Sequence, residues 1–307
     1  MRTLFVGAGA TGGYFGGRLA SGGKDVTFLV RPGRAATLRE RGLRIKSPGS
    51  ETVVQPRLIT ADRVDGPYDL VVIAVKSYFL EQAMIDLAPA VGPSTVVVPL
   101  LNGMRHVEEL VGAFGPERAW GGLCFVQATL NADGDVVRTG AMHRLGYGPL
   151  DGSADPRLPA VTEALTGEEF DSHPSRTIVQ DMWEKWQYLA SMAAITTLMG
   201  GTTAEVNAVP GGAEFSARVV AEALAVLTAA GHDPRPGALT LLHDDTHTTT
   251  RQVSTSMYRD MVAGLPVEAE AVLGDFVNEA GKAGVPAPMF AAAYAHMRVY
   301  AARRSAG

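Results

Sequence analysis

The sequence predicts an α/β protein in which an N-terminal doubly wound domain precedes an all-helical C-terminal domain. Two observations predict this class: short apolar runs alternate with helix-like stretches in the first half, and the sequence is helix-like from about Ile178 onward. A chain of 307 residues is long enough for two domains of ordinary size. We place the boundary after residue 172, which gives domains 1–172 and 173–307.

Runs of apolar and β-branched residues predict the strands of the first domain. Runs this short and this apolar are typical of parallel strands that helices bury on both faces. They lie at Thr3–Val6, Asp25–Val30, Leu70–Val75 and Thr95–Val98, with a first helix expected at about Thr11–Ala20.

The end of this domain has a different pattern. Asn131–Asp135 is a turn signal between two strand-like runs, and His143–Gly148 resembles a closing strand. We therefore expect antiparallel strands at the edge of the sheet.

The second domain is expected to consist of helices separated by glycine and proline. The expected helices cover about Met182–Met199, Ala217–Ala230 and Met289–Arg304. Breaks are expected at residues 209–212 and 285–288, where glycine and proline cluster.

Charge and hydropathy exclude several classes of protein. A formal net charge of −5 argues against a nucleic-acid partner, since such proteins usually carry a basic domain or stripe. No apolar run approaches the roughly 18 residues of a membrane span. The N-terminus lacks the pattern of a signal peptide. We expect a cytoplasmic protein with a small-molecule partner and no membrane partner.

The single cysteine and the spaced histidines do not indicate a reactive or metal site. One cysteine, Cys124, excludes an internal disulfide, and we expect it to be a buried, inert strand residue. His243 and His247 have the spacing of metal ligands on one helix face, but no clear third ligand accompanies them. We expect a solvated polar face there and no metal.

The segment 7–12 reads GAGATG, the G-x-G-x-x-G pattern, between a strand-like run and a helix-like run. Gly7 permits a tight turn, Gly9 lets the backbone approach a pyrophosphate, and Gly12 allows close packing of helix against strand. The helix N-terminus then offers unpaired N–H groups to the phosphates. This context predicts a dinucleotide site of the Rossmann type. The residues expected to bind the cofactor are Gly7, Gly9, Ala10, Thr11 and Gly12.

The end of the second strand indicates which dinucleotide is bound. NAD enzymes usually place a carboxylate there to bind the ribose 2′-hydroxyl, whereas this strand ends in Arg31 with Arg34 close behind. A guanidinium can form charge-assisted hydrogen bonds with a 2′-phosphate. We therefore expect NADPH/NADP, although two solvated loop arginines are the alternative interpretation.

Several short motifs in order give the chain a resemblance to the ketopantoate reductase family (2-dehydropantoate 2-reductase), nearly end to end. The resemblance implies a Rossmann domain joined to a helical domain, with the active site in the cleft between them. It also implies NADPH-dependent reduction of a 2-oxo acid to a 2-hydroxy acid, as in pantothenate biosynthesis, and we expect a homodimer. The motifs are GAGATG, Val75-Lys76, Leu101–Met104, Trp183–Lys185, and Ser256-Met257 followed by Glu268.

The resemblance assigns a role to each matching position. Lys185 matches the catalytic lysine, and Glu268 matches its carboxylate partner. Asn102 matches an asparagine near the nicotinamide and the substrate, and Ser256 matches a serine that contacts substrate. The two remaining matches are on the cofactor: Lys76 lines its cleft, and Arg31 meets the 2′-phosphate.

The chemistry also calls for such groups. Hydride addition to a ketone leaves negative charge on oxygen, which a cationic donor such as Lys185 stabilises and can protonate. A nearby Glu268 would favour the charged lysine. From the residues alone, however, Lys185 could be a surface lysine and Glu268 a solvated helix residue. Ser256 could be a helix cap, and Asn102-Gly103 a turn.

Two positions depart from the family pattern and bear on the substrate. The family usually has asparagines four and eight residues after the lysine, where this chain has Leu189 and Ala193. Helical spacing keeps both on the lysine's face, so apolar surface replaces two polar contacts. A 2-oxo acid with a more apolar tail than ketopantoate becomes a plausible substrate. A non-catalytic NADPH sensor, or a reductase of another ketone or imine, remains an alternative.

Overall fold

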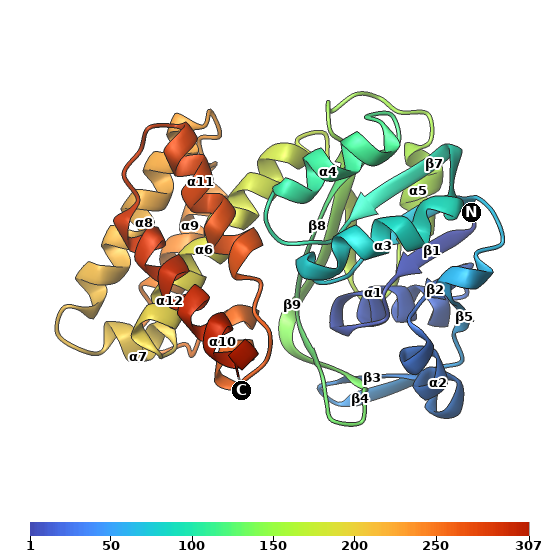
Figure 1. Cartoon of the computed structure of the whole chain (residues 1–307), viewed down its shortest axis with the longest axis horizontal. Helices are drawn as coiled ribbons and strands as arrows, with labels where there is room; N and C mark the ends of the chain where they lie inside the picture. The colour runs from blue at the N-terminus through green and yellow to red at the C-terminus, as the bar shows by residue number, and fades with distance from the viewer. Residues whose placement is uncertain (307) are drawn as a thin grey trace. The chain divides into compact units, whose positions relative to one another are not determined.

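The computed structural model describes residues 1–306, and these form two compact units (Figure 1). The first unit comprises Met1–Leu101 and His106–Val179. The second begins at Gln180, and the short segment Asn102–Arg105 clusters with it. The sequence placed the boundary after residue 172 and did not anticipate that this short segment would join the later unit.

A five-stranded parallel sheet is the centre of the first unit. Its strand order is β5-β2-β1-β6-β7, so the chain runs outward on one side of β1 and returns to build the other side. This order and the parallel pairing confirm the doubly wound prediction. The strands are β1 (Thr3–Val6), β2 (Val26–Leu29), β5 (Arg57–Ile59), β6 (Tyr68–Ile73) and β7 (Val91–Pro99).

Helices bury both faces of this sheet, which explains why its strands are apolar at almost every position. On β1, Phe5 packs into one hydrophobic core, whereas Leu4 and Val6 pack into the core on the opposite face. The helices of this unit are α1 (Ala10–Ser21), α2 (Pro32–Arg41), α3 (Leu80–Leu87), α4 (Arg105–Phe114) and α5 (Leu158–Leu165), with short 3-10 turns η1 (Ala61–Arg63), η2 (Ser77–Phe79) and η3 (Ala88–Ala90).

The antiparallel strands expected near residues 124–150 exist, but they do not lie at the edge of the parallel sheet. They belong to a second sheet of order β10-β9-β3-β4, in which β8 also pairs with β9. The expectation was wrong because β9 is long enough to pair with β3 near one end and β10 near the other, so it organises its own sheet. The strands are β3 (Leu43–Ser47), β4 (Ser50–Val54), β8 (Trp120–Leu130), β9 (Val136–Pro149) and β10 (Asp171–Pro174).

The second unit is helical, as predicted. The three expected helices correspond to α6, α8 and α12. One turn, η4, is π-helical and leads directly into α11. No helix within residues 1–306 is long and apolar enough to cross a membrane. The elements are α6 (Ile178–Met199), α7 (Thr203–Asn207), α8 (Gly212–Ala229), α9 (Pro236–Thr246), α10 (Ser256–Val262), η4 (Glu270–Gly274), α11 (Asp275–Lys282) and α12 (Pro288–Ala306).

Candidate active site

The glycine loop between β1 and α1 has the backbone geometry that its motif predicts. Gly7 has a φ of 96°, a region in which side chains are strained. A Cβ on Gly12 would lie 2.2 Å from the Gly7 carbonyl oxygen, so only glycine allows the helix to start this close. A Cβ on Gly9 would meet nothing within 4 Å, which leaves open space beside the backbone. Ala10 and Thr11 form the first turn of α1 and are partly exposed.

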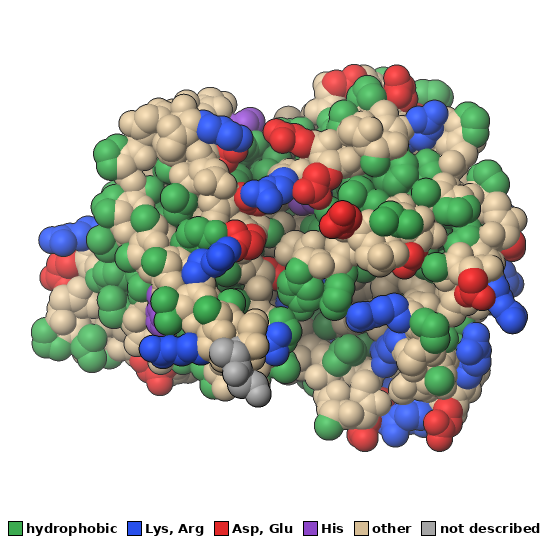
Figure 2. All heavy atoms as spheres, viewed as in Figure 1, with side chains coloured by type: hydrophobic (Ala, Val, Ile, Leu, Met, Phe, Trp, Pro, Cys, Tyr) green, Lys and Arg blue, Asp and Glu red, His purple; other side chains and the backbone are tan. Residues whose placement is uncertain are grey.

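Strand order brings the other expected cofactor residues to the same edge of the sheet. β2, β1 and β6 are parallel neighbours, so the segments after them meet at the carboxyl edge. Arg31 follows β2, and Lys76 follows β6. The Arg31 guanidinium lies 4.4 Å from the ring centroid of Phe79, a cation–π contact. Basic side chains are frequent on the visible face of this unit near α2 and β3 (Figure 2).

Arg34, the second arginine after β2, makes different contacts from Arg31. Its Nε donates to the Ala8 carbonyl oxygen at 3.0 Å, and its Nη1 donates to the Gly134 carbonyl oxygen at 2.9 Å. Burial lowers the pKa of this guanidinium. Arg34 therefore braces the glycine loop against the β8–β9 turn, whereas Arg31 remains exposed to solvent.

Lys185 lies in the middle of α6 and is buried, with 6% of its surface exposed. This burial excludes the surface-lysine interpretation. Glu184, the preceding residue, accepts hydrogen bonds at 2.8 Å from the backbone N–H and the Nε of Arg235. Burial acts to raise the pKa of Glu184, but the contacts with Arg235 outweigh it and hold that pKa below its ordinary value.

Glu268 and Asn102 are both placed beside the π-helical turn η4. Glu268 is 7% exposed, which excludes the solvated-helix interpretation, and its carbonyl oxygen accepts from the Val272 N–H at 3.2 Å. Gly103 has a φ of 84°, and a Cβ there would lie 2.3 Å from the Ala271 carbonyl oxygen. The Asn102-Gly103 bend is thus a turn, and it packs directly against η4.

The remaining substrate-side positions lie on α10 and α6. Ser256 is the first residue of α10, but Thr255 is the cap, since its hydroxyl accepts from the Tyr258 N–H at 3.2 Å. The helix-cap interpretation of Ser256 is therefore excluded. Leu189 is half-buried and Ala193 is 1% exposed, one and two turns after Lys185 on α6.

The predicted residues thus fall into two groups. The glycine loop, Arg31 and Lys76 share one edge of the parallel sheet in the first unit. The other four predicted residues belong to the second unit, and they are Lys185, Glu268, Asn102 and Ser256.

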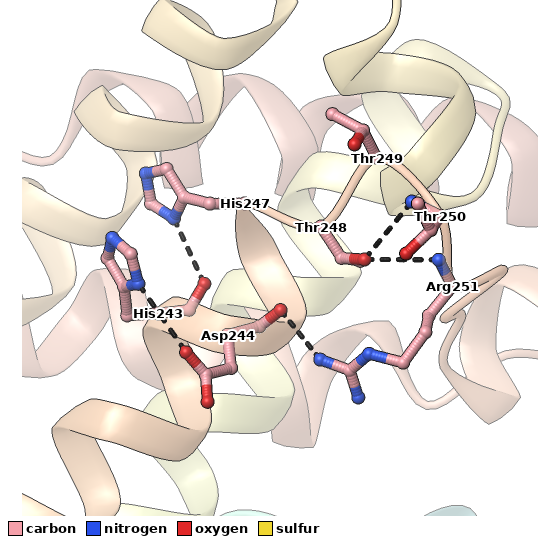
Figure 3. A pocket seen from close by; sticks show the side chains of 7 residues that line it. All are labelled: His243, Asp244, His247, Thr248, Thr249, Thr250 and Arg251. Atoms are coloured by element: carbon pink, nitrogen blue, oxygen red, sulfur yellow. Dashed lines mark hydrogen bonds and ion pairs between the residues drawn. The ribbon is translucent and has the colours of Figure 1, made fainter.

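A pocket of about 350 Å³ at the end of α9 contains none of these residues (Figure 3). In it the rings of His243 and His247 stack with centroids 4.4 Å apart. Thr248 uses its hydroxyl locally, as acceptor for the Thr250 and Arg251 N–H groups. Within residues 1–306, no group of three or more His, Cys, Asp or Glu side chains could hold a metal ion. The other lining residues are Asp244 and Thr249.

Two contacts near these groups were not anticipated from the sequence. Phe79 lies under the Arg31 guanidinium, and its position shortly after a strand end was the available signal. Trp186 donates its indole N–H to the Val272 carbonyl oxygen at 3.0 Å. Nothing in the local sequence connects α6 to a residue 86 positions later.

The strand order and the glycine loop are those of a Rossmann-type dinucleotide-binding domain, and comparison with known proteins identifies the family. Residues 3–152 match the model "Ketopantoate reductase PanE/ApbA", and residues 177–301 match "Ketopantoate reductase PanE/ApbA C terminal". The chain belongs to the ketopantoate reductase family, which confirms the resemblance.

Relatives cover the chain from end to end. It is 36% identical to the "Uncharacterized oxidoreductase YkpB" of Bacillus subtilis (strain 168), over 99% of this chain and 100% of that protein. It is 26% identical to a 2-dehydropantoate 2-reductase of Mesorhizobium japonicum, over 99% of both chains. A structure of D-mandelate dehydrogenase with NADH and anilino(oxo)acetate superposes with a TM-score of 0.86, at 22% identity, over 99% of this chain and 100% of that one. This chain is therefore an oxidoreductase of the ketopantoate reductase family.

Proposed function

We propose that the protein reduces a 2-oxo acid to the 2-hydroxy acid with NADPH, and that Lys185 is the proton donor. The observation that carries the proposal is the burial of Lys185 together with Glu268 in one helical unit. Lysine and glutamate are almost never this buried unless they are charge-compensated. Ketone reduction develops negative charge on the carbonyl oxygen, and a buried cationic donor such as Lys185 would stabilise that charge.

The residues of the second unit would act on the carbonyl and the carboxylate of the substrate. The Lys185 ammonium would donate a hydrogen bond to the keto oxygen and transfer its proton as negative charge develops there. Glu268 would hold the lysine in its charged form before the reaction. Asn102 would add a neutral hydrogen bond near the reacting carbon, and Ser256 would bind the substrate carboxylate.

The first unit fits the dinucleotide. Bound NADPH would supply the hydride that is added to the keto carbon. The open space at Gly9 admits a pyrophosphate to the backbone, and the N-terminus of α1 presents N–H groups to it. Arg31, held exposed over Phe79, would bind the 2′-phosphate, and Lys76 would line the same site.

The substrate would be 2-dehydropantoate or a related acid with a more apolar tail. Leu189 and Ala193 present apolar surface where polar contacts are usual in the family. A site without those donors loses its discrimination in favour of a hydroxylated tail. The D-mandelate dehydrogenase that shares this fold has been solved with anilino(oxo)acetate, an oxoacetate that carries an anilino group. That ligand gives a reason to include phenylglyoxylate among the acids tested.

The same two apolar residues support the second candidate, a non-catalytic NADPH sensor. A third candidate, reduction of another ketone or an imine on the same fold, retains the donor and changes only the substrate. The homodimer and the cytoplasmic location also remain proposals, of which light scattering on the purified protein tests the first.

Steady-state NADPH oxidation by the purified protein separates these candidates. The panel contains 2-dehydropantoate, phenylglyoxylate and branched aliphatic 2-oxo acids, with simple ketones and an imine as controls. We expect turnover of 2-oxo acids and none of simple ketones. Tight NADPH binding without turnover of any acid would favour the sensor, and turnover confined to the control ketones or the imine would favour the third candidate.

A further inference from the structure

The turn η4 is an unusual piece of backbone in this unit. Its five residues, Glu270–Gly274, are π-helical, between Ala269 and the start of α11. A π-helical turn contains one more residue than an α-helical turn and is found disproportionately at functional sites. A local backbone irregularity persists only where neighbouring residues stabilise it, and three sets of contacts do so here.

The first contact comes from α6. Trp186 directly follows Lys185, is 1% exposed, and donates its indole N–H to the Val272 carbonyl oxygen at 3.0 Å. Its ring also meets Phe276 of α11 edge-on, with centroids 5.2 Å apart. The segment of helix that carries Lys185 is therefore tied to the middle of η4.

The second contact comes from the segment that carries Asn102. At Gly103, a Cβ would come within 2.3 Å of the Ala271 carbonyl oxygen, so this backbone lies directly on η4. Two residues further on, Arg105 forms an ion pair with Asp275, the first residue after η4. Burial raises the pKa of Asp275, and Arg105 acts against that rise.

The third set of contacts joins η4 to α12. Glu270 accepts a hydrogen bond from the Tyr294 hydroxyl and forms an ion pair with Arg298, both on α12. A Cβ on Gly274 would lie 2.8 Å from the Tyr294 ring, so the turn also packs closely against α12. The Glu268 carbonyl oxygen accepts from the Val272 N–H at 3.2 Å, so Glu268 is joined to η4 through a backbone hydrogen bond.

We infer that η4 is the common support that sets the positions of Lys185, Glu268 and Asn102 relative to one another, and that Trp186 is the positioning residue for Lys185. Each of the three groups lies beside one contact with the turn: Lys185 beside Trp186, Asn102 beside Gly103, and Glu268 at the end of the turn. The catalytic part of this inference rests on the proposed function. The physical coupling of the three segments through η4 is independent of the proposed function.

Trp186→Phe tests the inference, with Trp183→Phe as the matched control. Phenylalanine keeps an aromatic ring at 186 but removes the N–H that binds Val272. Trp183 lies on the same helix, stacks on His232 with centroids 4.4 Å apart and packs against Trp186 with centroids 5.2 Å apart. Trp183→Phe therefore keeps an aromatic ring beside Trp186 and leaves the bond from the Trp186 N–H to Val272 intact. Because small displacements of a catalytic group are costly, we expect Trp186→Phe to lower kcat by about tenfold to a hundredfold. The KM and Kd for NADPH should stay unchanged, and Trp183→Phe should keep the wild-type kcat.

Hydrogen exchange measures the coupling without any activity. In Trp186→Phe, we expect faster amide exchange both in residues 268–275 and in the segment 102–105, which the substitution does not touch. In Trp183→Phe, both segments should exchange as in the wild type.

Each outcome bears on one of the two claims. Equal kcat in Trp186→Phe and wild type, or faster exchange near residue 186 alone, would overturn the role of η4 as common support. A wild-type protein that turns over no 2-oxo acid would contradict the proposed function, while coupled exchange in Trp186→Phe would still support the shared turn.

Discussion

The two units form their candidate binding regions from different parts of the chain: the first from backbone groups and the second from buried side chains. The loop after β1 relies on backbone: glycines without side chains, N–H groups of α1, and a carbonyl held by Arg34. The region around η4 relies on buried charged side chains, among them Lys185 and Glu268. The first region is therefore sensitive to any added Cβ, and the second is sensitive to the loss of a charge or of a contact that supports one.

Adding a methyl group to the glycine loop should give the largest effect on stability. Gly12→Ala places a Cβ 2.2 Å from the Gly7 carbonyl oxygen, so β1 and α1 must separate. We expect a loss of more than about 2 kcal/mol in the free energy of unfolding, measured by urea denaturation. Gly9→Ala is the matched control for stability, since its Cβ meets nothing. It should unfold like the wild type yet bind NADPH more weakly, and equal destabilisation of both variants would contradict this dependence on the backbone.

The next effect separates the two arginines after β2. Removing charge-assisted hydrogen bonds costs about 1.5–3 kcal/mol, so Arg31→Ala should weaken NADPH binding roughly tenfold to a hundredfold. NADH binding should change little, because it lacks the 2′-phosphate. Arg34→Ala should instead lower stability and weaken both cofactors alike, because Arg34 braces Ala8. Isothermal titration with both cofactors gives the comparison, and an equal loss for both in Arg31→Ala would refute the phosphate assignment.

A smaller effect is expected on substrate choice. Leu189 is half-buried one turn after Lys185, so Leu189→Asn can place an amide there without overpacking. We expect the ratio of kcat/KM for 2-dehydropantoate over phenylglyoxylate to rise by about tenfold. An unchanged ratio would show that this position does not face the substrate tail. Ala193 is 1% exposed and has no room for the same substitution.

The smallest effect concerns pH and the stability of the helical unit. Burial lowers the pKa of His232 below its ordinary value of 6.5, so the folded protein binds fewer protons there than the unfolded chain. The contribution of neutral His232 is present above pH 6.5 and is lost as the pH falls below that value. His232→Phe keeps the stack on Trp183 and should therefore lose less Tm than the wild type between about pH 7.5 and about pH 5.5. An identical loss of Tm in both proteins would contradict this assignment.

Local patterns predicted the parts of the molecule that local physics determines. The strand Thr3–Val6 and the loop geometry of Gly7 and Gly12 follow from residues that are adjacent in sequence. The β3–β4 hairpin was missed, because its strands are short and largely polar, with only Pro48-Gly49 to mark the turn.

The candidate catalytic residues came from family resemblance, and their supports could not come from sequence at all. The contact of Trp186 with Val272 and that of Gly103 with Ala271 join residues distant in the chain. A π-helical turn has no distinctive sequence pattern, since packing with its neighbours determines whether it forms.

The most direct test of the role of Lys185 compares Lys185→Ala with the wild type in single-turnover reduction of a 2-oxo acid by NADPH. We predict a fall in the rate of about 10²–10⁴-fold, because the proton donor is lost, with the Kd for NADPH nearly unchanged. Circular dichroism of the variant controls for folding. A Lys185→Ala protein that is folded, binds NADPH and reduces the acid at the wild-type rate would contradict the assignment of Lys185 as proton donor.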